Sequence, residues 1–214
     1  MTTPDPRIKH LLEVAGFGEV AKIRHFKIDD CLITSLVERW RPETHIFHLL
    51  VGECTITLEY VALQLGLRID GKPVTRPTFF DWDELCYELL GLPPKGEALV
   101  GSSIKLKWLK DHTITLPDEP TKQQLHQHCR AYILELIGGV IMPEKSGNRI
   151  HLMYLPLLAY LKRAGRYSWG SACLAHLYRE MCRAIYPSSK KMGGCSLLLQ
   201  SWAWYRMPSI QPRV

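Results

Sequence analysis

The chain has 214 residues, of which 46% are hydrophobic and 22% charged, so it can build a full apolar core as one ordinary domain or two small ones. Residues 1–144 hold 16 Lys and Arg against 20 Asp and Glu, a net charge of −4, whereas residues 145–214 hold 11 Lys and Arg against Glu180 alone, a net charge of +10. No window approaches the roughly 18 uncharged apolar residues of a membrane span, and the first residues lack the basic region and apolar run of a secretory signal.

The chain opens with two predicted helices. Residues 6–15 have a helical pattern that ends at Gly16. Asp29 or Asp30 can cap the second helix, and Pro42 stops it. Its buried face is predicted to consist of Leu32, Ile33, Leu36, Val37 and Trp40.

A hairpin and a third helix are predicted next. Residues 45–57 are rich in β-branched and aromatic side chains, which favours a small β-hairpin with Gly52-Glu53 at its middle. Thr57 can cap the following helix, and Gly66 suits the left-handed residue just past its end. Its core positions have the spacing i, i+3, i+4 and i+7 and are Leu58, Val61, Ala62 and Leu65.

Three further helices are predicted in the middle of the chain. Residues 81–91 begin with an aspartate cap, carry a glutamate three positions later and end in glycine. Residues 102–108 form a short helix that begins at a serine. Residues 121–139 begin with the capping box Thr-Lys-Gln-Gln and end at Gly-Gly. The inward residues of this last helix are Leu125, Cys129, Tyr132, Ile133, Leu136 and Ile137.

The C-terminal part is also predicted to be helical. Residues 145–148 form a turn, residues 156–164 can be helical, and residues 169–186 and 196–205 form strong helices, the last apolar nearly all round. The core face of the 169–186 helix is Leu174, Leu177, Tyr178, Met181, Cys182 and Ile185. Residues 66–80 are not a convincing linker. We therefore expect a mainly α protein, a compact single-domain helical bundle over residues 1–214 with one or two short β-hairpins.

Reactive chemistry is sparse in this sequence. The seven cysteines are scattered without a CxxC pair, which favours reduced thiols in a cytosolic or nuclear compartment. His126, His128 and Cys129 are potential metal ligands, but neighbours two apart on a helix point to different faces. A structural metal held by distant residues, or a Cys–His nucleophile whose partners meet only in space, stays open.

Residues 138–146, GGVIMPEKS, bear a faint likeness to a phosphate-binding loop. Such a loop needs glycine directly before its lysine, but Glu144 stands there and would repel an anion. The acidic pairs at 29–30 and 81–83 lie at predicted helix starts, where the helix dipole already explains them. The sequence therefore predicts neither nucleotide binding nor a catalytic acid pair.

The basic C-terminal third is the candidate contact surface. Its charge suits an acidic partner, either nucleic acid or an acidic protein surface, unless it forms a solvated face paired with the acidic N-terminal part. The candidate contacts are Lys145, Arg149, Lys162, Arg163, Arg166, Arg179, Arg183, Lys190 and Lys191.

Aromatic side chains are interleaved with these cations. They could stack on the bases of a single strand, or they could be core and rim residues of a helical bundle. They are Tyr167, Trp169, Trp202, Trp204 and Tyr205.

An ordered set of short blocks resembles the plant mobile domain of the MAIN-like (maintenance-of-meristems) proteins. The blocks are WRPETHIFH (40–48), GECTITLEYVALQLGLRIDGKPV (52–74), ELLG (88–91), LIGG (136–139) with KSGN (145–148), YSWGSA (167–172) with LYR (177–179), and GGC (193–195) with LQSWAWY (199–205). Each block is weak alone, but their order is specific. Such domains usually run on beyond this chain's end, which suggests a C-terminally trimmed or short member.

Two departures from the family pattern are visible. Tyr60 stands where members often carry an acid that would complete a capping box with Thr57, and Tyr205 stands where a glutamate usually precedes the final arginine. Neither touches a catalytic group, because the family has no established one. Its older "aminotransferase-like" label finds no support, since no lysine lies in a recognisable pyridoxal-phosphate setting.

The resemblance implies a nuclear plant protein, host-encoded or carried by a transposable element. Similar host proteins are linked to transposon silencing, control of gene expression, genome integrity and meristem maintenance, and they work with a phosphoprotein-phosphatase-like partner. The leading hypothesis is thus a non-enzymatic interaction module without a cofactor, metal or small-molecule substrate. The alternative is direct nucleic-acid binding through the basic C-terminal third. A hidden enzyme would need a pocket where polar groups converge.

Overall fold

The computed structural model describes residues 3–23, 27–50, 52–75, 81–94, 98–113, 115–186 and 191–211. Within these ranges the chain is a compact, mainly α-helical domain with two small antiparallel sheets. None of the helices in these ranges combines the length and the apolar character needed to cross a membrane.

Two long helices organise the structure, α6 (Lys122–Leu136) and α8 (Trp169–Ala184). The other described helices are η1 (Pro6–Ile8), α1 (Lys9–Val14), η2 (Val20–Lys22), α2 (Asp30–Val37), α3 (Leu58–Leu65), α4 (Trp82–Leu90), α5 (Leu106–His112), η4 (Ile137–Ile141), η5 (Leu152–Leu158), α7 (Leu161–Ala164), α9 (Ser196–Arg206) and η6 (Pro208–Ile210).

The two sheets have three short strands each. The first has the order β1 (Trp40–Arg41), β2 (Ile46–Leu49) and β3 (Gly52–Cys54). The second pairs β5 (Ser103–Lys105) with β4 (Leu99–Val100) on one side and β6 (Arg149–His151) on the other. In this sheet Ile104 lies opposite both Leu99 and Ile150, so the second sheet joins segments more than forty residues apart.

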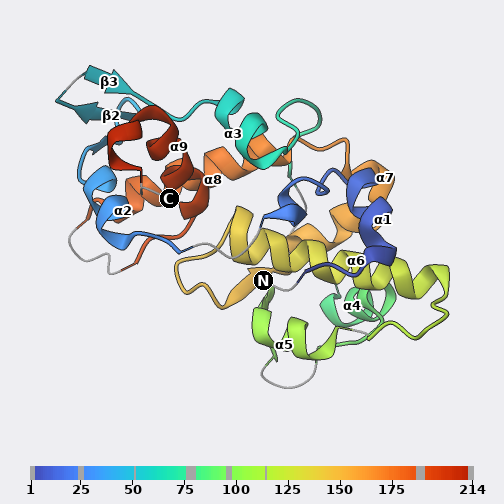
Figure 1. Cartoon of the computed structure of the whole chain (residues 1–214). Helices are drawn as coiled ribbons and strands as arrows, with labels where there is room; N and C mark the ends of the chain where they lie inside the picture. Colours follow the sequence, from blue (N-terminus) through green and yellow to red (C-terminus); the bar gives the residue numbers. More distant parts are fainter. Residues whose placement is uncertain are drawn as a thin grey trace.

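The elements gather around the two long helices (Figure 1). Helix α6 contacts α1, α4, α5 and η5, and α7 lies beside α1 and η5. Helix α8 contacts α3 and β1, while α9 contacts α2 and α3. Burial is complete or nearly so for the largest core side chains, which are Trp40, Trp169, Trp202, Phe17 and Phe47.

The sequence predicted the helix boundaries that depend on local chemistry. The Asp29 side chain accepts the amide of Leu32 at the start of α2. The capping box at the start of α6 is present in full. Gly66 and Gly91 end α3 and α4 in the left-handed conformation. These features confirm the predicted mainly α fold class.

Several predicted details around the first sheet are wrong. Thr57 is the N-cap residue of α3, but its side chain makes no capping hydrogen bond. Trp40 lies in β1, because α2 already ends at Val37. Gly52 and Glu53 begin strand β3 and therefore do not form the middle of the hairpin. A third strand thus pairs with the predicted hairpin.

The segment predicted as a helix over 102–108 is instead a strand followed by a helix. Residues 103–105 pair with β6, which lies more than forty residues later and gives no local signal. Residues 156–164 are split between the 3₁₀ helix η5 and α7.

Three further expectations need correction or fall partly outside the description. Helix α6 does not end at Gly138, because the chain continues through the π-helical turn η4, where a Cβ on Gly138 would meet Ile150 at 2.8 Å. Ile185 is 36% exposed and is not a core residue. Residues 66–75 contain no helix or strand beyond an isolated bridge at Lys72, and residues 76–80 lie outside the described ranges.

Candidate functional site

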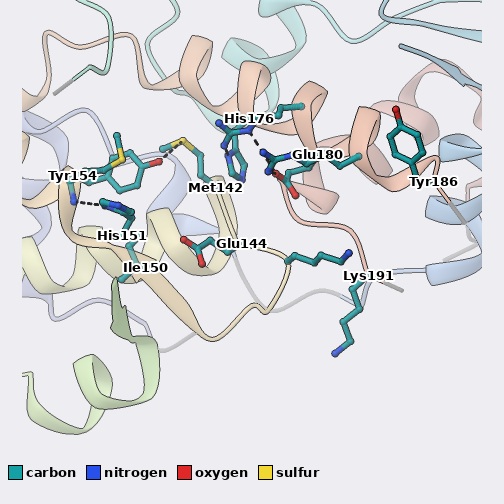
Figure 2. Close-up of a pocket in the computed structure, with 13 residues that line it drawn as sticks. Met142, Glu144, Ile150, His151, Tyr154, His176, Glu180, Tyr186 and Lys191 are labelled. Carbon is teal, nitrogen blue, oxygen red and sulfur yellow. Dashed lines mark hydrogen bonds and ion pairs between the residues drawn. The ribbon is translucent and has the colours of Figure 1, made fainter. Parts of the chain in front are cut away.

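A polar cavity of about 650 Å³ lies between α8 and the segment 142–154, and we call it the α8 cavity (Figure 2). Histidines, a tyrosine, acids and cations all face it. In Figure 2, His151 and Tyr154 lie toward one end and Tyr186 and Lys191 toward the other. The side chains that decide its chemistry are His151, Tyr154, His176, Arg179, Glu180 and Arg183.

Both ring nitrogens of His176 are engaged. Nε2 lies 3.2 Å from the carbonyl of Pro143, which can only accept, so Nε2 carries the proton. Nδ1 then accepts a hydrogen bond from Arg179 Nη2 at 2.7 Å. Burial lowers the pKa of His176, with the positive charge of Arg179 lowering it further. The imidazole is therefore neutral and has no free nitrogen.

His151 is held in the same way at the other side of the cavity. Its Nδ1 accepts the backbone amide of Met153 at 3.0 Å, so Nε2 carries the proton and donates it to Ser102 Oγ at 2.7 Å. Burial lowers the pKa of His151. Neither histidine offers a lone pair to a metal ion or to a substrate proton.

Several other potential nucleophiles are shielded by burial, whereas Cys31 is exposed on α2. Burial raises the pKa of Cys86 and of Cys129 to about 12 and raises the pKa of Tyr154. Hydrogen bonding from the Cys173 thiol lowers the pKa of Cys195, but the Cys195 side chain is completely buried. Among the described residues, no group of three or more His, Cys, Asp or Glu side chains could hold a metal ion.

Glu180 is a buried carboxylate of the α8 cavity that forms ion pairs with the cavity's own arginines. Its side chain is only 7% exposed, lies 2.9 Å from Arg183 Nη1 and 3.8 Å from Arg179 Nε, and packs under the loop at Gly193. A Cβ at Gly193 would meet the Glu180 carboxylate at 2.8 Å, so glycine lets this loop approach. The cavity thus holds a carboxylate that pairs with two of its own cations and offsets one of their two positive charges.

A second, smaller hollow lies at α7, and we call it the α7 cleft. It has a volume of about 360 Å³ and is lined by Lys72, Tyr160, Lys162, Arg163 and Arg166. All five side chains belong to exposed residues, and Tyr160 is 73% exposed. No acid lines this cleft among the residues that the structure describes.

Backbone pairing fixes the position of Lys72 in the α7 cleft. The amide of Lys72 donates to the carbonyl of Arg166 at 3.1 Å, and the amide of Ser168 donates to the carbonyl of Lys72 at 2.8 Å. Gly71 has a φ of +107°, and a Cβ there would meet the Arg166 carbonyl oxygen at 2.4 Å. Glycine at position 71 is thus required for the cleft to form.

A buried arginine supports the other wall of the α7 cleft from inside. The guanidinium of Arg130 donates to the carbonyls of Leu158 at 3.0 Å, Ala159 at 2.8 Å and Leu89 at 3.1 Å. These bonds fix the backbone directly before Tyr160. Burial lowers the pKa of Arg130, and the three carbonyls accept hydrogen bonds from its Nε, Nη1 and Nη2 atoms.

The four cations of the α7 cleft have no ion pair or side-chain hydrogen bond with any described residue. The acid nearest to Lys72 in the chain is Asp70, and Arg68 already binds it through two contacts of 3.0 Å. These hydrogen bonds lower the pKa of Asp70. The positive charge of the cleft is therefore available to a ligand.

The structure places seven of the nine basic residues singled out in the sequence in one or the other of these two hollows. Lys145, Arg179, Arg183 and Lys191 line the α8 cavity, and Lys162, Arg163 and Arg166 line the α7 cleft. Arg149 lies on β6, with its Nη1 buried and without a hydrogen-bond partner among the described residues. Lys190 lies outside the described residues. Arg166 precedes α8, whereas Arg179 lies about 15 Å further along that helix.

Most of the interleaved aromatic residues belong to the core. Trp169 and Trp202 are 1% and 0% exposed, and Tyr167 is 9% exposed, so none of the three can stack on a base. Tyr205 is 67% exposed and packs edge-on against Tyr60. The exposed aromatic beside the unpaired cations is Tyr160, which the sequence did not single out.

The domain defined by this fold is a known one. Residues 16–214 match the family model of the plant mobile domain, and the chain belongs to that family. No solved structure matches the chain.

Three relatives from Arabidopsis thaliana are similar over nearly the whole chain. Protein MAIN-LIKE 2 is 42% identical over 98% of this chain, Protein MAINTENANCE OF MERISTEMS is 40% identical over 95%, and the serine/threonine-protein phosphatase 7 long form homolog is 44% identical over 95%. The matched regions make up 31%, 43% and 15% of these relatives, respectively. The chain therefore spans less than half of each of them.

Proposed function

We propose that this chain is a non-enzymatic interaction module that acts through protein partners, among them a phosphoprotein-phosphatase-like protein. The main support for the proposal is that a similar domain is part of longer relatives that carry different names. A similar domain makes up 15% of a relative named as a phosphatase, and larger shares of relatives named otherwise. A domain that recurs in such different contexts suits recognition better than one fixed reaction.

The chemistry of the α8 cavity supports a non-enzymatic role. The cavity brings two histidines, two tyrosines and two acids together, as an active site would. However, His151 and His176 use both ring nitrogens within the protein, and Glu180 is committed to its own arginines. A general base needs a free, accessible lone pair, which neither histidine has. The side chains that line the cavity instead hold α8 against the 142–154 segment.

The partner is tested by co-purification. The chain is mixed at micromolar concentration and moderate salt with the phosphatase 7 long form homolog from which its own plant mobile domain has been deleted. We expect the two to elute together in size-exclusion chromatography. Separate elution at about 10 μM of each protein would contradict the proposal, because a specific interface holds at that concentration.

The cellular role follows from the same family membership. We propose that the chain acts in the nucleus, in transposon silencing, gene-expression control and genome integrity. A fluorescent fusion expressed in plant cells should accumulate in the nucleus, and loss of the protein should raise transposon transcripts. A fusion excluded from nuclei would refute the nuclear assignment without bearing on the partner.

Nucleic-acid binding is the second candidate, and the unpaired cations of the α7 cleft favour it. Binding through phosphates releases counterions, so affinity should fall steeply with salt. The charge that nucleic acid could use is concentrated in Lys72, Lys162, Arg163 and Arg166, since Glu180 offsets Arg179 and Arg183. A gel-shift assay at low salt with single-stranded DNA and RNA tests this candidate.

A further inference from the structure

The α7 cleft concentrates positive charge in a small space. Four cations, Lys72, Lys162, Arg163 and Arg166, line a hollow of about 360 Å³, and its described lining contains no acid. Like charges held this close repel one another unless an anion neutralises them. The arrangement is nevertheless fixed by backbone hydrogen bonds at residue 72 and by the Arg130 guanidinium beneath residues 158–159. The fold thus maintains a charge cluster that is incomplete without a ligand.

The number and type of the cations indicate how much negative charge a matching ligand carries. A carboxylate carries one negative charge, whereas a phosphate monoester carries about 1.5 to 2 at neutral pH and presents three strong acceptor oxygens. The two arginines each offer a planar fork that matches two phosphate oxygens, and the lysines add point charges. A phosphomonoester satisfies this set better than a carboxylate does.

The hollow beside the α7 cleft indicates what carries the phosphate. It has a volume of about 230 Å³, shares Tyr160 and Arg163 with the cleft, and is otherwise lined by uncharged residues. Pro156, Leu157 and Ala159 form its apolar part. A nucleic-acid strand would place another phosphate at each nucleotide and requires a positive groove along its path. A hollow that has only Arg163 as a charged residue in its described lining, next to one strongly charged cleft, instead fits a peptide whose phosphorylated side chain has neutral neighbours.

We propose that the α7 cleft binds a phosphoserine- or phosphothreonine-bearing segment of a partner protein. Arg163 and Arg166 hold the phosphate, Lys72 and Lys162 complete its neutralisation, and a neighbouring uncharged side chain of the peptide occupies the hollow beside Tyr160. The inference rests on the proposed role in protein recognition and names one site and one chemistry for it.

The test uses the full chain and degenerate nine-residue peptide libraries that carry a fluorescent label. One library has phosphoserine fixed at its centre, and matched libraries have serine or glutamate there. We expect fluorescence anisotropy to detect binding of the phosphoserine library, about tenfold or more tighter than either matched library. Equal binding of the three libraries, or no binding of the phosphoserine library, would overturn the proposal.

Variants locate the site. Arg163→Glu combined with Arg166→Glu should abolish the preference for phosphoserine. The matched control is Lys107→Glu combined with Lys110→Glu on α5, because it makes the same charge change at two exposed residues outside the cleft. Equal loss of binding in both double variants would mean a non-specific charge effect and would refute the site. Thermal unfolding curves of both variants check that each remains folded.

Labelled oligonucleotides distinguish the competing ligand. If single-stranded DNA or RNA of about 20 nucleotides binds more tightly than the phosphoserine library, and the cleft variant loses that binding, the ligand is nucleic acid and the proposal is wrong. Binding to the phosphatase partner is measured in a separate co-elution experiment. Co-elution of the Arg163→Glu, Arg166→Glu variant with the phosphatase partner, together with no phosphopeptide binding by the wild type, would remove this inference and leave the proposed function standing.

Discussion

The α7 cleft and the α8 cavity draw on the same basic C-terminal segment, but they treat their cations in opposite ways. In the α8 cavity, Arg183 lies 2.9 Å from the buried Glu180 carboxylate and Arg179 binds His176 at 2.7 Å. In the α7 cleft, Arg163 and Arg166 have no such contact with any described residue. Net charge by segment therefore does not locate a binding surface, because pairing decides which charges are available.

Each region also rests on one buried ionisable residue, and the two differ in sign. Arg130 is 8% exposed beneath the α7 cleft and is satisfied by three backbone carbonyls, which leave its charge in place. Glu180 is 6% exposed beneath the α8 cavity and pairs with two arginines, so it offsets part of their charge. The buried arginine adds to the positive potential of the α7 cleft, whereas the buried glutamate lowers the positive potential of the α8 cavity.

The largest expected effect is on the backbone that forms the α7 cleft. Gly71→Ala places a Cβ 2.4 Å from the Arg166 carbonyl oxygen at a φ of +107°. Because the obstacle is backbone and the conformation is strained for alanine, the free energy of unfolding should fall by about 3 kcal/mol. Urea denaturation measures it. Gly101→Ala is the control: its φ is +58° with nothing within 4 Å, so it should cost about 1 kcal/mol. Equal losses would mean that residue 71 does not fix the cleft.

The next prediction concerns a substitution that would leave the cations of the α8 cavity without their carboxylate, as the cations of the α7 cleft are. Glu180→Gln keeps the side-chain shape and frees Arg179 and Arg183 from their carboxylate. Because both arginines are more than half exposed, the loss of stability should be only about 1 kcal/mol. The variant should also elute from a heparin column at higher salt than the wild type.

A matched acid-to-amide change tests whether burial matters for this effect. Glu38 lies 3.8 Å from Arg39 with both side chains well exposed, so Glu38→Gln removes the same formal charge from a weak surface pair. Its stability should change by less than about 0.5 kcal/mol. If Glu38→Gln costs as much stability as Glu180→Gln, the buried carboxylate is not what distinguishes the α8 cavity.

The third effect is a dependence of stability on pH that distinguishes the α8 cavity from the α7 cleft, although His126 on α6, whose pKa burial also lowers, contributes to it as well. Burial lowers the pKa of His151 and of His176 below the usual 6.5, so the unfolded chain binds protons first as the solution is acidified. Stability from these residues is complete above pH 6.5 and is lost as the pH falls through the lower pKa values of the folded state. The described lining of the α7 cleft contains no histidine.

Urea midpoints between about pH 7.5 and about pH 5 measure this dependence. His151→Gln combined with His176→Gln should flatten the curve, because a glutamine amide can donate and accept as the neutral ring does but does not take up a proton. An unchanged slope in the double variant would assign the pH dependence to other groups.

The sequence predicts the parts of this fold that local chemistry decides. The Asp29 cap, the Thr121–Gln124 capping box and the terminal Gly66 depend on residues within a few positions of one another. The second sheet could not be predicted in this way, because β5 pairs with β6 across more than forty residues. Helix α6 likewise continues past its glycines because the core needs Gly138 close to Ile150.

The candidate site is predictable only in part, for the same reason. The basic C-terminal third contains Lys162, Arg163 and Arg166, and the sequence singles them out. Lys72 lies in the acidic part of the chain and reaches the α7 cleft only through its pairing with residues 166–168. The available signal was its place in the GKPV block that carries the family resemblance. The pairing of Arg183 with Glu180 follows helical spacing and could have been read from positions i and i+3.

The smallest expected effect on stability is at the α7 cleft itself, and it bears directly on the contrast between the two regions. Arg163→Glu removes an exposed cation that contacts no acid in the described part of the chain, so the free energy of unfolding should change by less than about 0.5 kcal/mol, or rise slightly as repulsion among the cleft cations is relieved. Arg183→Glu, the same change in the α8 cavity, brings a second carboxylate to within reach of the buried Glu180 and should cost about 2 kcal/mol. Urea denaturation of the two variants side by side measures both values. A large loss for Arg163→Glu would mean that its guanidinium stabilises the fold, and the α7 cleft could then no longer be regarded as charge kept free for a ligand.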